Sequence, residues 1–107
     1  MNKGNKNPEE HLRLLFEAIL TLETVEECSA FFHDICTVQE TNAMKERFEV
    51  ARMLDDGLTY VEICKSTGVS SATISRVKKY LEYGADGYKV TLNRLRKKGI
   101  LPLKDQA

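Results

Sequence analysis

Twenty residues in the second half of the chain, from Tyr60 to Lys79, place the tightest constraint on its fold. Gly68 stands where a short helix would end in a left-handed residue. Four residues earlier, Cys64 is small enough to let two helices pack closely. Apolar side chains lie at spacings that direct them into one shared interior: Ile63, Val69, Ile74 and Val77. The pattern predicts a helix-turn-helix, two short helices that cross at a steep angle.

Capping patterns divide the whole chain into about six helices, and no stretch alternates in the way a β-strand does. Asn7 and Pro8 mark the first start. Thr-x-x-Glu boxes that begin at Thr24, Thr37 and Thr59 mark three more. The expected helices span residues 7 to about 22, 24–35, 37–56, 59–67, 70–83 and 88–99. The fold class is therefore all-α.

The first helix is too apolar for a single neighbour. Eight of the eleven residues from Leu12 to Leu22 are apolar, and a helix that is apolar nearly all round must be enclosed. A chain of 107 residues has few ways to enclose its first helix, so we expect a homodimer. The next helix is expected to turn five residues inward: Val25, Cys28, Phe31, Phe32 and Ile35.

The length suits one domain spanning residues 1–107. Within it we expect dimerisation helices over residues 7–58, the helix-turn-helix over residues 59–83 and a C-terminal helix over residues 84–99. Residues 100–107 are expected to form a tail that is frayed from Pro102 onward.

The net charge is zero, but the two halves differ. Residues 1–59 hold six basic and twelve acidic residues, and residues 60–104 hold ten basic and three acidic ones. The resulting charges of −6 and +7 indicate a basic half that faces a polyanion and an acidic scaffold. The alternative is that the basic residues form an ordinary solvated surface.

Several classes of protein are excluded by composition. No uncharged run approaches the length of a membrane span, and the polar N-terminus does not resemble a signal peptide. Cys28, Cys36 and Cys64 lack metal-ligand spacing and are interpreted as buried, reduced thiols of a cytoplasmic protein. His11 and His33 are too isolated for a zinc site. Without a phosphate loop, a metal motif or a catalytic triad, we expect neither an enzyme nor a cofactor.

The second helix of the motif is the expected recognition helix. Small, hydroxylated and basic side chains that could contact base edges lie on its exposed side: Ser70, Ser71, Ala72, Thr73, Ser75 and Arg76. Lys65, Lys78 and Lys79 are expected to bind phosphates, because an ammonium lacks planar, directional donors. Five cations near the C-terminus are further candidates for phosphate contacts: Lys89, Arg94, Arg96, Lys97 and Lys98. For the last four of these, a solvated face is the alternative.

The stretch from Val69 to Val77, with the link Tyr83-Gly84-Ala85-Asp86-Gly87-Tyr88, resembles the Trp repressor family, and more closely its Trp-repressor-like branch of YerC/YecD-type proteins. The resemblance covers roughly residues 12–97. It implies a bacterial, all-helical, intertwined homodimer that binds double-stranded DNA and regulates transcription as a repressor. A symmetric dimer of this kind implies a palindromic operator, with half-sites about one helical turn of DNA apart.

The resemblance also implies a candidate ligand pocket formed by Arg47, Arg76, Thr37 and Tyr80. Arg47 and Arg76 match the two arginines that hold the tryptophan ring in the repressor. Tyr80 replaces a ligand-binding serine, and Val77 replaces a glycine beside the ligand. Asp34 and Cys36 replace apolar residues, although Thr37 is retained. Because larger side chains would fill the pocket, we hypothesise that tryptophan is not the corepressor; the effector stays unidentified.

One alternative function stays open. The acidic N-terminal half and the zero net charge would also suit a protein-interaction module that keeps the helix-turn-helix packing without reading DNA.

Overall fold

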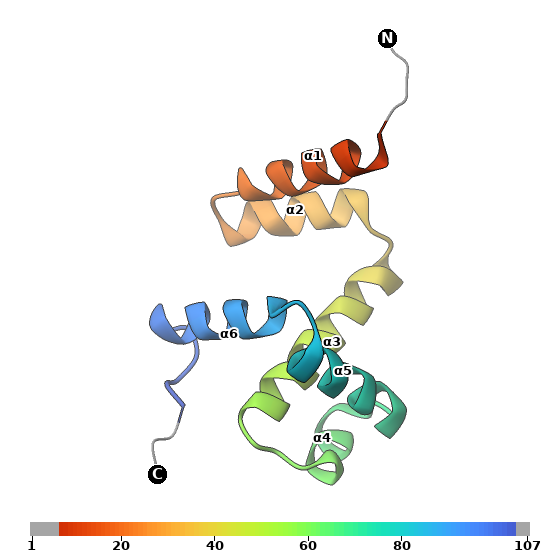
Figure 1. The fold of residues 1–107 in the computed structure, drawn as a ribbon, viewed down its shortest axis with the longest axis vertical. Helices are drawn as coiled ribbons and strands as arrows, with labels where there is room; N and C mark the ends of the chain where they lie inside the picture. The colour runs from red at the N-terminus through yellow and green to blue at the C-terminus, as the bar shows by residue number, and fades with distance from the viewer. Residues whose placement is uncertain (1–6, 105–107) are drawn as a thin grey trace. The chain divides into compact units, whose positions relative to one another are not determined.

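The computed structural model describes residues 7–104 of the chain, and this part contains six α-helices and no β-strand (Figure 1). The number and order of the helices agree with the sequence prediction. Their bounds are α1 Pro8–Leu20, α2 Val25–Ile35, α3 Val38–Asp55, α4 Tyr60–Thr67, α5 Ser71–Tyr83 and α6 Gly87–Lys97. Residues 105–107 of the predicted tail lie outside the described part.

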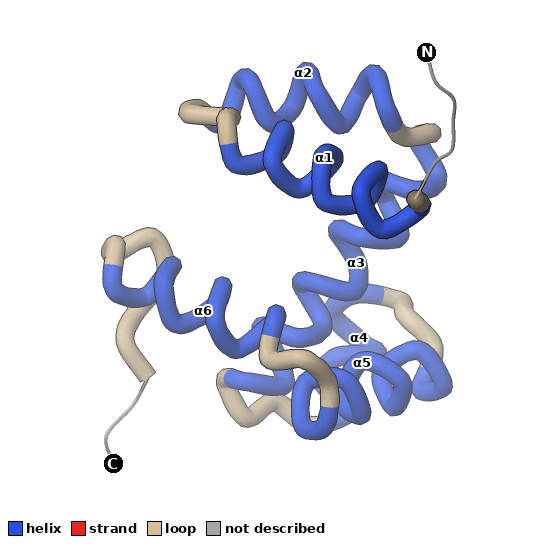
Figure 2. Tube along the Cα trace, turned by 45° about the horizontal axis from the view of Figure 1, so that its top comes forward, coloured by secondary structure: helices blue, strands red, loops and turns tan. Residues whose placement is uncertain are grey.

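The chain divides into two compact units, Met1–Thr41 and Asn42–Ala107. The first unit contains α1 and α2, which run side by side as a helical hairpin (Figure 2). The second contains α4, α5, α6 and the part of α3 that follows Thr41.

The first unit buries little of its apolar surface. Neither α1 nor α2 holds a buried residue, and only Phe31 and Phe32 of the expected inward set are half-buried. Their rings meet edge to face with centroids 5.5 Å apart. The prediction that Val25, Cys28 and Ile35 point inward is wrong for this chain, since all three are exposed. A hairpin of two helices covers only one face of each.

Side-chain caps form at all four predicted helix starts. Asn7 Oδ1 accepts a hydrogen bond from Glu9 N–H at 3.0 Å. The boxes that begin at Thr37 and Thr59 are reciprocal, and in each the threonine N–H donates to the glutamate carboxylate at 2.8 Å. The box at Thr24 forms only in part, because Glu27 Oε1 accepts from the N–H of Glu23 instead.

A single apolar core holds the second unit together. It combines three residues of α3 with residues from α4, the turn that follows, α5 and α6: Val50, Ala51, Met53, Ile63, Val69, Ile74, Val77 and Leu92. The four residues that the sequence placed in the helix-turn-helix interior are all among them, and each is at most 8% exposed. That prediction is confirmed.

The segment after α6 is attached to the second unit rather than frayed. Gly99, at φ 78°, turns the chain, and Ile100 N–H donates to the carbonyl of Leu95 at 3.0 Å. Leu101 then packs against the core, and the Pro102 carbonyl accepts from Arg96 Nη1 at 2.7 Å. The prediction of a frayed tail is therefore wrong for residues 102–104.

The cysteines also differ from expectation. Cys28 is exposed, while Cys36 and Cys64 are half-buried. Cys28 lies on α2, which holds no buried residue, so its apolar surroundings in the sequence did not predict its exposure.

Candidate nucleic-acid interface

The turn between α4 and α5 has the geometry that the sequence predicted. Gly68 adopts φ 73° and ψ 4°, and its N–H donates to the Cys64 carbonyl at 2.9 Å. Thr67 supports the same turn through its hydroxyl, which donates to the Ile63 carbonyl at 2.7 Å and accepts from Val69 N–H at 3.1 Å. The turn fixes where α5 begins.

The first residues of α5 form a side-chain cap. Ser70 Oγ accepts from Thr73 N–H and donates to Thr73 Oγ1, both at 3.2 Å. Of the six predicted base-contacting residues, Ser70 and Thr73 therefore already bond to each other. Ser71 and Ala72 are exposed beside them. An N-terminus of this kind also favours anions, since its free amides and the helix dipole point toward solvent.

One face of α5 is buried and the opposite face is free. Ile74, Val77 and Leu81 follow the helical repeat on the buried face. Four exposed residues occupy the positions opposite to it, and we call them the α5 outer face: Ala72, Ser75, Arg76 and Lys79. The structure thus brings together three of the predicted base-contacting residues and one predicted phosphate-binding lysine.

The three predicted phosphate-binding lysines differ in their surroundings. Lys78 lies toward α4, with Nζ 3.9 Å from Glu82 Oε2 and 5.9 Å from the centre of the Tyr60 ring. Lys79 Nζ lies 5.8 Å from the centre of the Tyr80 ring and forms no ion pair among residues 7–104. Lys65 is exposed on α4. Lys79 and Lys65 are therefore freer to bind phosphate than Lys78 is.

The cations of α6 and of its C-cap, Lys98, separate into two groups. Arg96 is buried and bonded to Asp55 and Asp56, so its candidate role as a phosphate contact is wrong. The pairing spans about 40 residues of sequence, which helical periodicity cannot detect. The other four cations are exposed and unpaired in the described part of the chain: Lys89, Arg94, Lys97 and Lys98. In both views α6 points away from α4 (Figures 1 and 2).

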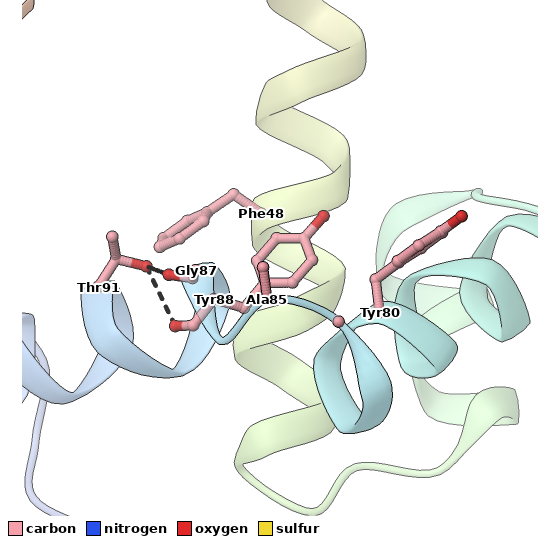
Figure 3. Close-up of a pocket in the computed structure, with 7 residues that line it drawn as sticks. Phe48, Tyr80, Ala85, Gly87, Tyr88 and Thr91 are labelled. Atoms are coloured by element: carbon pink, nitrogen blue, oxygen red, sulfur yellow. Dashed lines mark hydrogen bonds between the residues drawn. The ribbon is translucent and has the colours of Figure 1, made fainter. Parts of the chain in front are cut away.

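A shallow cavity of about 380 Å³ opens where α3, α5 and α6 meet (Figure 3). Aromatic rings and the backbone of the link form its walls: Phe48, Tyr80, Gly84, Ala85, Gly87, Tyr88 and Thr91. The Phe48 and Tyr88 rings lie 6.3 Å apart, and the Thr91 hydroxyl donates to the Gly87 and Tyr88 carbonyls. Within residues 7–104, no lysine, arginine or carboxylate lines the cavity.

The candidate ligand pocket is not assembled in the second unit. Of its four residues only Tyr80 lines the cavity, and Arg47 and Arg76 are exposed outside it. Thr37 belongs to the first unit, where its hydroxyl caps α3. Phe48 and Tyr88 were not predicted as cavity residues. The sequence held one indication of this cavity: Gly84 and Gly87 of the link place no side chain in the cavity wall.

Comparison with known proteins places this geometry in a family. The family model described as Trp repressor protein matches residues 10–96, most of the chain. The chain belongs to the Trp repressor family. Proteins of this family are DNA-binding regulators.

Relatives within the Trp repressor family come from bacteria. The Bacillus subtilis (strain 168) protein YerC is 51% identical over 82 residues, which cover 77% of this chain and 79% of YerC. A crystal structure of a TrpR-like protein from Eubacterium eligens ATCC 27750 has a TM-score of 0.79 at 45% identity, covering 88% of this chain and 94% of that one. A crystal structure from Staphylococcus aureus has a TM-score of 0.77 at 49% identity, covering 80% and 86%. The resemblance inferred from the sequence is confirmed.

Two further features bear on the class of protein. No helix in residues 7–104 is long and apolar enough to cross a membrane. The same residues contain no group of three or more His, Cys, Asp or Glu side chains that could hold a metal ion.

Proposed function

We propose that this Trp repressor family member is a cytoplasmic transcriptional repressor that binds double-stranded DNA sequence-specifically. The observation that carries the proposal is the α5 outer face. It is a continuous exposed row of small, hydroxylated and basic side chains on a helix whose other face is fixed in the core. A rigid helix of this kind fits the major groove of B-DNA.

The surroundings of each side chain suggest whether it would contact a base or a phosphate. Arg76 has the planar donors that suit guanine, and Ala72 and the Thr73 methyl group suit a thymine methyl. Ser71 and Ser75 can bond to bases or phosphates. Lys79 and Lys65 are exposed and suit phosphates, whereas Lys78 has Glu82 and Tyr60 beside it. Ser70 acts chiefly by holding Thr73 in place.

The proposal includes a homodimer. The first unit leaves large apolar side chains exposed, and in α1 they include Leu14, Phe16 and Leu20 at 68%, 53% and 79% exposure. Such a surface in one place favours association. Two-fold symmetry would then present two α5 outer faces to a palindromic operator.

We further propose that tryptophan is not the corepressor. The open cavity has aromatic walls but no cation to pair with the carboxylate of an amino acid, and its one residue from the candidate pocket is Tyr80. Isothermal titration calorimetry of the homodimer with L-tryptophan should give no heat of binding in the micromolar range. Saturable micromolar binding would contradict this part of the proposal.

The test of DNA recognition begins with a duplex selected from a random library by the purified protein. Affinity for this duplex and for random DNA is then measured by fluorescence anisotropy. Arg76→Ala and Thr73→Ala should weaken the selected duplex more than random DNA, because both would remove base contacts. Lys79→Ala should weaken both alike, since phosphate contacts carry no sequence information.

Salt dependence supplies the matched control. Each phosphate contact adds about 0.9 to the slope of log affinity against log salt concentration. Lys79→Ala should therefore reduce the slope by about one, whereas Lys45→Ala, the same change at an exposed lysine of α3 with no assigned DNA contact, should leave it unaltered. If Arg76, Thr73 and Lys79 variants all act alike, the assignment of base contacts is wrong.

The interaction-module alternative predicts another result. A protein of that kind would select no duplex and would shift no genomic fragment in a mobility-shift assay, while gel filtration would still report a defined oligomer.

A further inference from the structure

A chain of alternating charges joins the C-terminal end of α3 to α6 and to the segment after it. Glu49 pairs with Arg52, Arg52 with Asp56, Asp56 with Arg96, Arg96 with Asp55, and Asp55 with Lys104. The contacts of Arg96 are the shortest between separate elements, at 2.8 Å to Asp55 and 2.9 Å to Asp56. We call these six side chains the α3–α6 charge network.

Arg96 is the centre of this network. Its side chain is 5% exposed, and Nη1 also donates to the Pro102 carbonyl at 2.7 Å. Nε has no partner within the described residues, so the guanidinium is held entirely by its two terminal nitrogens. A buried cation is stable only while its partners stay in place. Arg96 therefore requires α3, α6 and Pro102 to keep one arrangement.

Local helix physics does not explain the two aspartates. Carboxylates at a helix C-terminus face the negative end of the helix dipole and are disfavoured there. Asp55 and Asp56 nevertheless stand at the end of α3. Hydrogen bonds from Arg96 and Lys104 overcome the effect of burial and lower the pKa of Asp55. The long-range pairing thus accounts for residues that the helix itself would not favour.

The network lies directly before the helix-turn-helix. Gly57 follows Asp56 at φ 89°, and Leu58 N–H donates back to the Met53 carbonyl at 3.0 Å. Three residues then lead from Asp56 to the start of α4 at Tyr60. Holding Asp56 against α6 fixes the point from which α4 and α5 depart.

We propose that Arg96 is a positioning residue for DNA recognition. Through Asp55 and Asp56 it holds the turn into α4 at a fixed angle to α3 and α6, with the Pro102 carbonyl and Lys104 closing the network from the other side. In the homodimer this angle sets the distance between the two α5 outer faces and so the accepted half-site spacing. The inference rests on the proposed function.

The first test requires no DNA. Arg96→Lys keeps the charge but cannot bond to two carboxylates and a carbonyl at once. Hydrogen exchange in the intact chain should show amides of residues 57–61 exchanging about tenfold faster, because local opening becomes easier. Arg94→Lys is the matched control, since Arg94 is exposed and unpaired on the same helix. Unchanged exchange in Arg96→Lys would overturn the inference.

The second test uses the selected duplex and versions with one or two base pairs inserted between its half-sites. Wild-type protein should prefer the selected spacing strongly. In Arg96→Lys this preference should fall roughly fivefold, because a looser turn accepts other spacings. A merely stabilising role would lower every affinity by one factor and leave the preference unchanged, and that result would overturn the inference.

The two tests distinguish the proposed DNA-binding function from the positioning role of Arg96. Failure of the wild-type protein to bind any duplex would contradict the proposed function, and the exchange experiment would still decide whether Arg96 fixes the turn. Should Arg96→Lys fail to fold, Asp56→Asn replaces it with the same expectations, since the amide keeps an acceptor for Arg96 but removes the charge.

Discussion

At the residue scale, Gly84 is the position where the backbone leaves no room for a side chain. A Cβ atom there would lie 2.3 Å from the Tyr80 carbonyl oxygen, which is the acceptor for Gly84 N–H itself. Gly84→Ala must therefore displace the end of α5 or the link. We expect a loss of about 3 kcal/mol in the free energy of unfolding, at the upper end of the usual cost of overpacking, measured by urea denaturation.

Gly87 provides the control for this substitution. A Cβ atom there meets nothing within 4 Å, and Gly87 is the first residue of α6. Gly87→Ala should be neutral or stabilise by up to about 1 kcal/mol, because alanine loses less entropy on folding. Equal unfolding free energies of the two variants would show that the link can shift to accommodate a Cβ atom at residue 84 without loss of stability.

Asp55 makes the free energy of unfolding depend on pH in the acidic range. Burial alone would raise the pKa of its carboxyl, but hydrogen bonds from Arg96 and Lys104 lower it below the ordinary value. In the unfolded chain the pKa of an aspartate is about 3.9. The stabilisation is therefore complete above about pH 4 and is lost as pH falls through the lower pKa of the folded state.

The corresponding measurement is urea denaturation at neutral pH and at several acidic values. Wild-type protein should lose more unfolding free energy below about pH 4 than Asp55→Asn does, because the amide does not titrate. Glu49 adds to the acid sensitivity of both proteins, since its hydrogen bond with Arg52 also lowers its pKa. Parallel pH profiles would contradict the role of Asp55.

At the element scale, the helix-turn-helix could be predicted in full because its determinants are local. Gly68, the Thr59 box and the apolar spacing all act within a few turns of helix, and each occurs in the structure as expected. The Arg96 network and the cavity could not be predicted in this way. Arg96 and Asp55 are 41 residues apart, and in sequence Arg96 is one cation among several.

The same limit explains the errors in the first two helices. Their apolar residues predicted burial, but a pattern of apolar residues does not specify which surface covers them. In the chain itself Val25 is 79% exposed. In the proposed homodimer the burial of such residues would depend on association, which lies beyond the local physics of a helix.

Gly68 allows a prediction about the turn as an element. Its φ of 73° is left-handed, while a Cβ atom there would meet nothing within 4 Å. Gly68→Ala should therefore cost about 1 kcal/mol through backbone strain alone, as measured by thermal unfolding. Gly68→Asn should cost less, because asparagine tolerates this conformation better. Equal effects of both substitutions would indicate that the turn changes conformation instead.

At the scale of the whole molecule, the first unit combines an excess of negative charge with exposed apolar surface. Residues 7–41 contain eight carboxylates and only one lysine or arginine, Arg13, which pairs with Glu17. The exposed apolar side chains of α1 lie in the same unit. Negative charge would repel DNA from this unit, while its apolar surface favours contact with protein. The two units thus suit different partners.

The proposed homodimer leads to a direct test on α1. Leu14 is 68% exposed in the single chain, so Leu14→Glu should leave the subunit folded but place a charge in the interface. Burying a leucine contributes about 1.5–3 kcal/mol, and the dimer dissociation constant should rise at least tenfold, roughly, by sedimentation equilibrium. His11→Glu introduces the same charge at an exposed polar position of α1 and should change the constant little. If both variants weaken the dimer equally, general repulsion rather than apolar contact governs association; if neither does, α1 lies outside the interface.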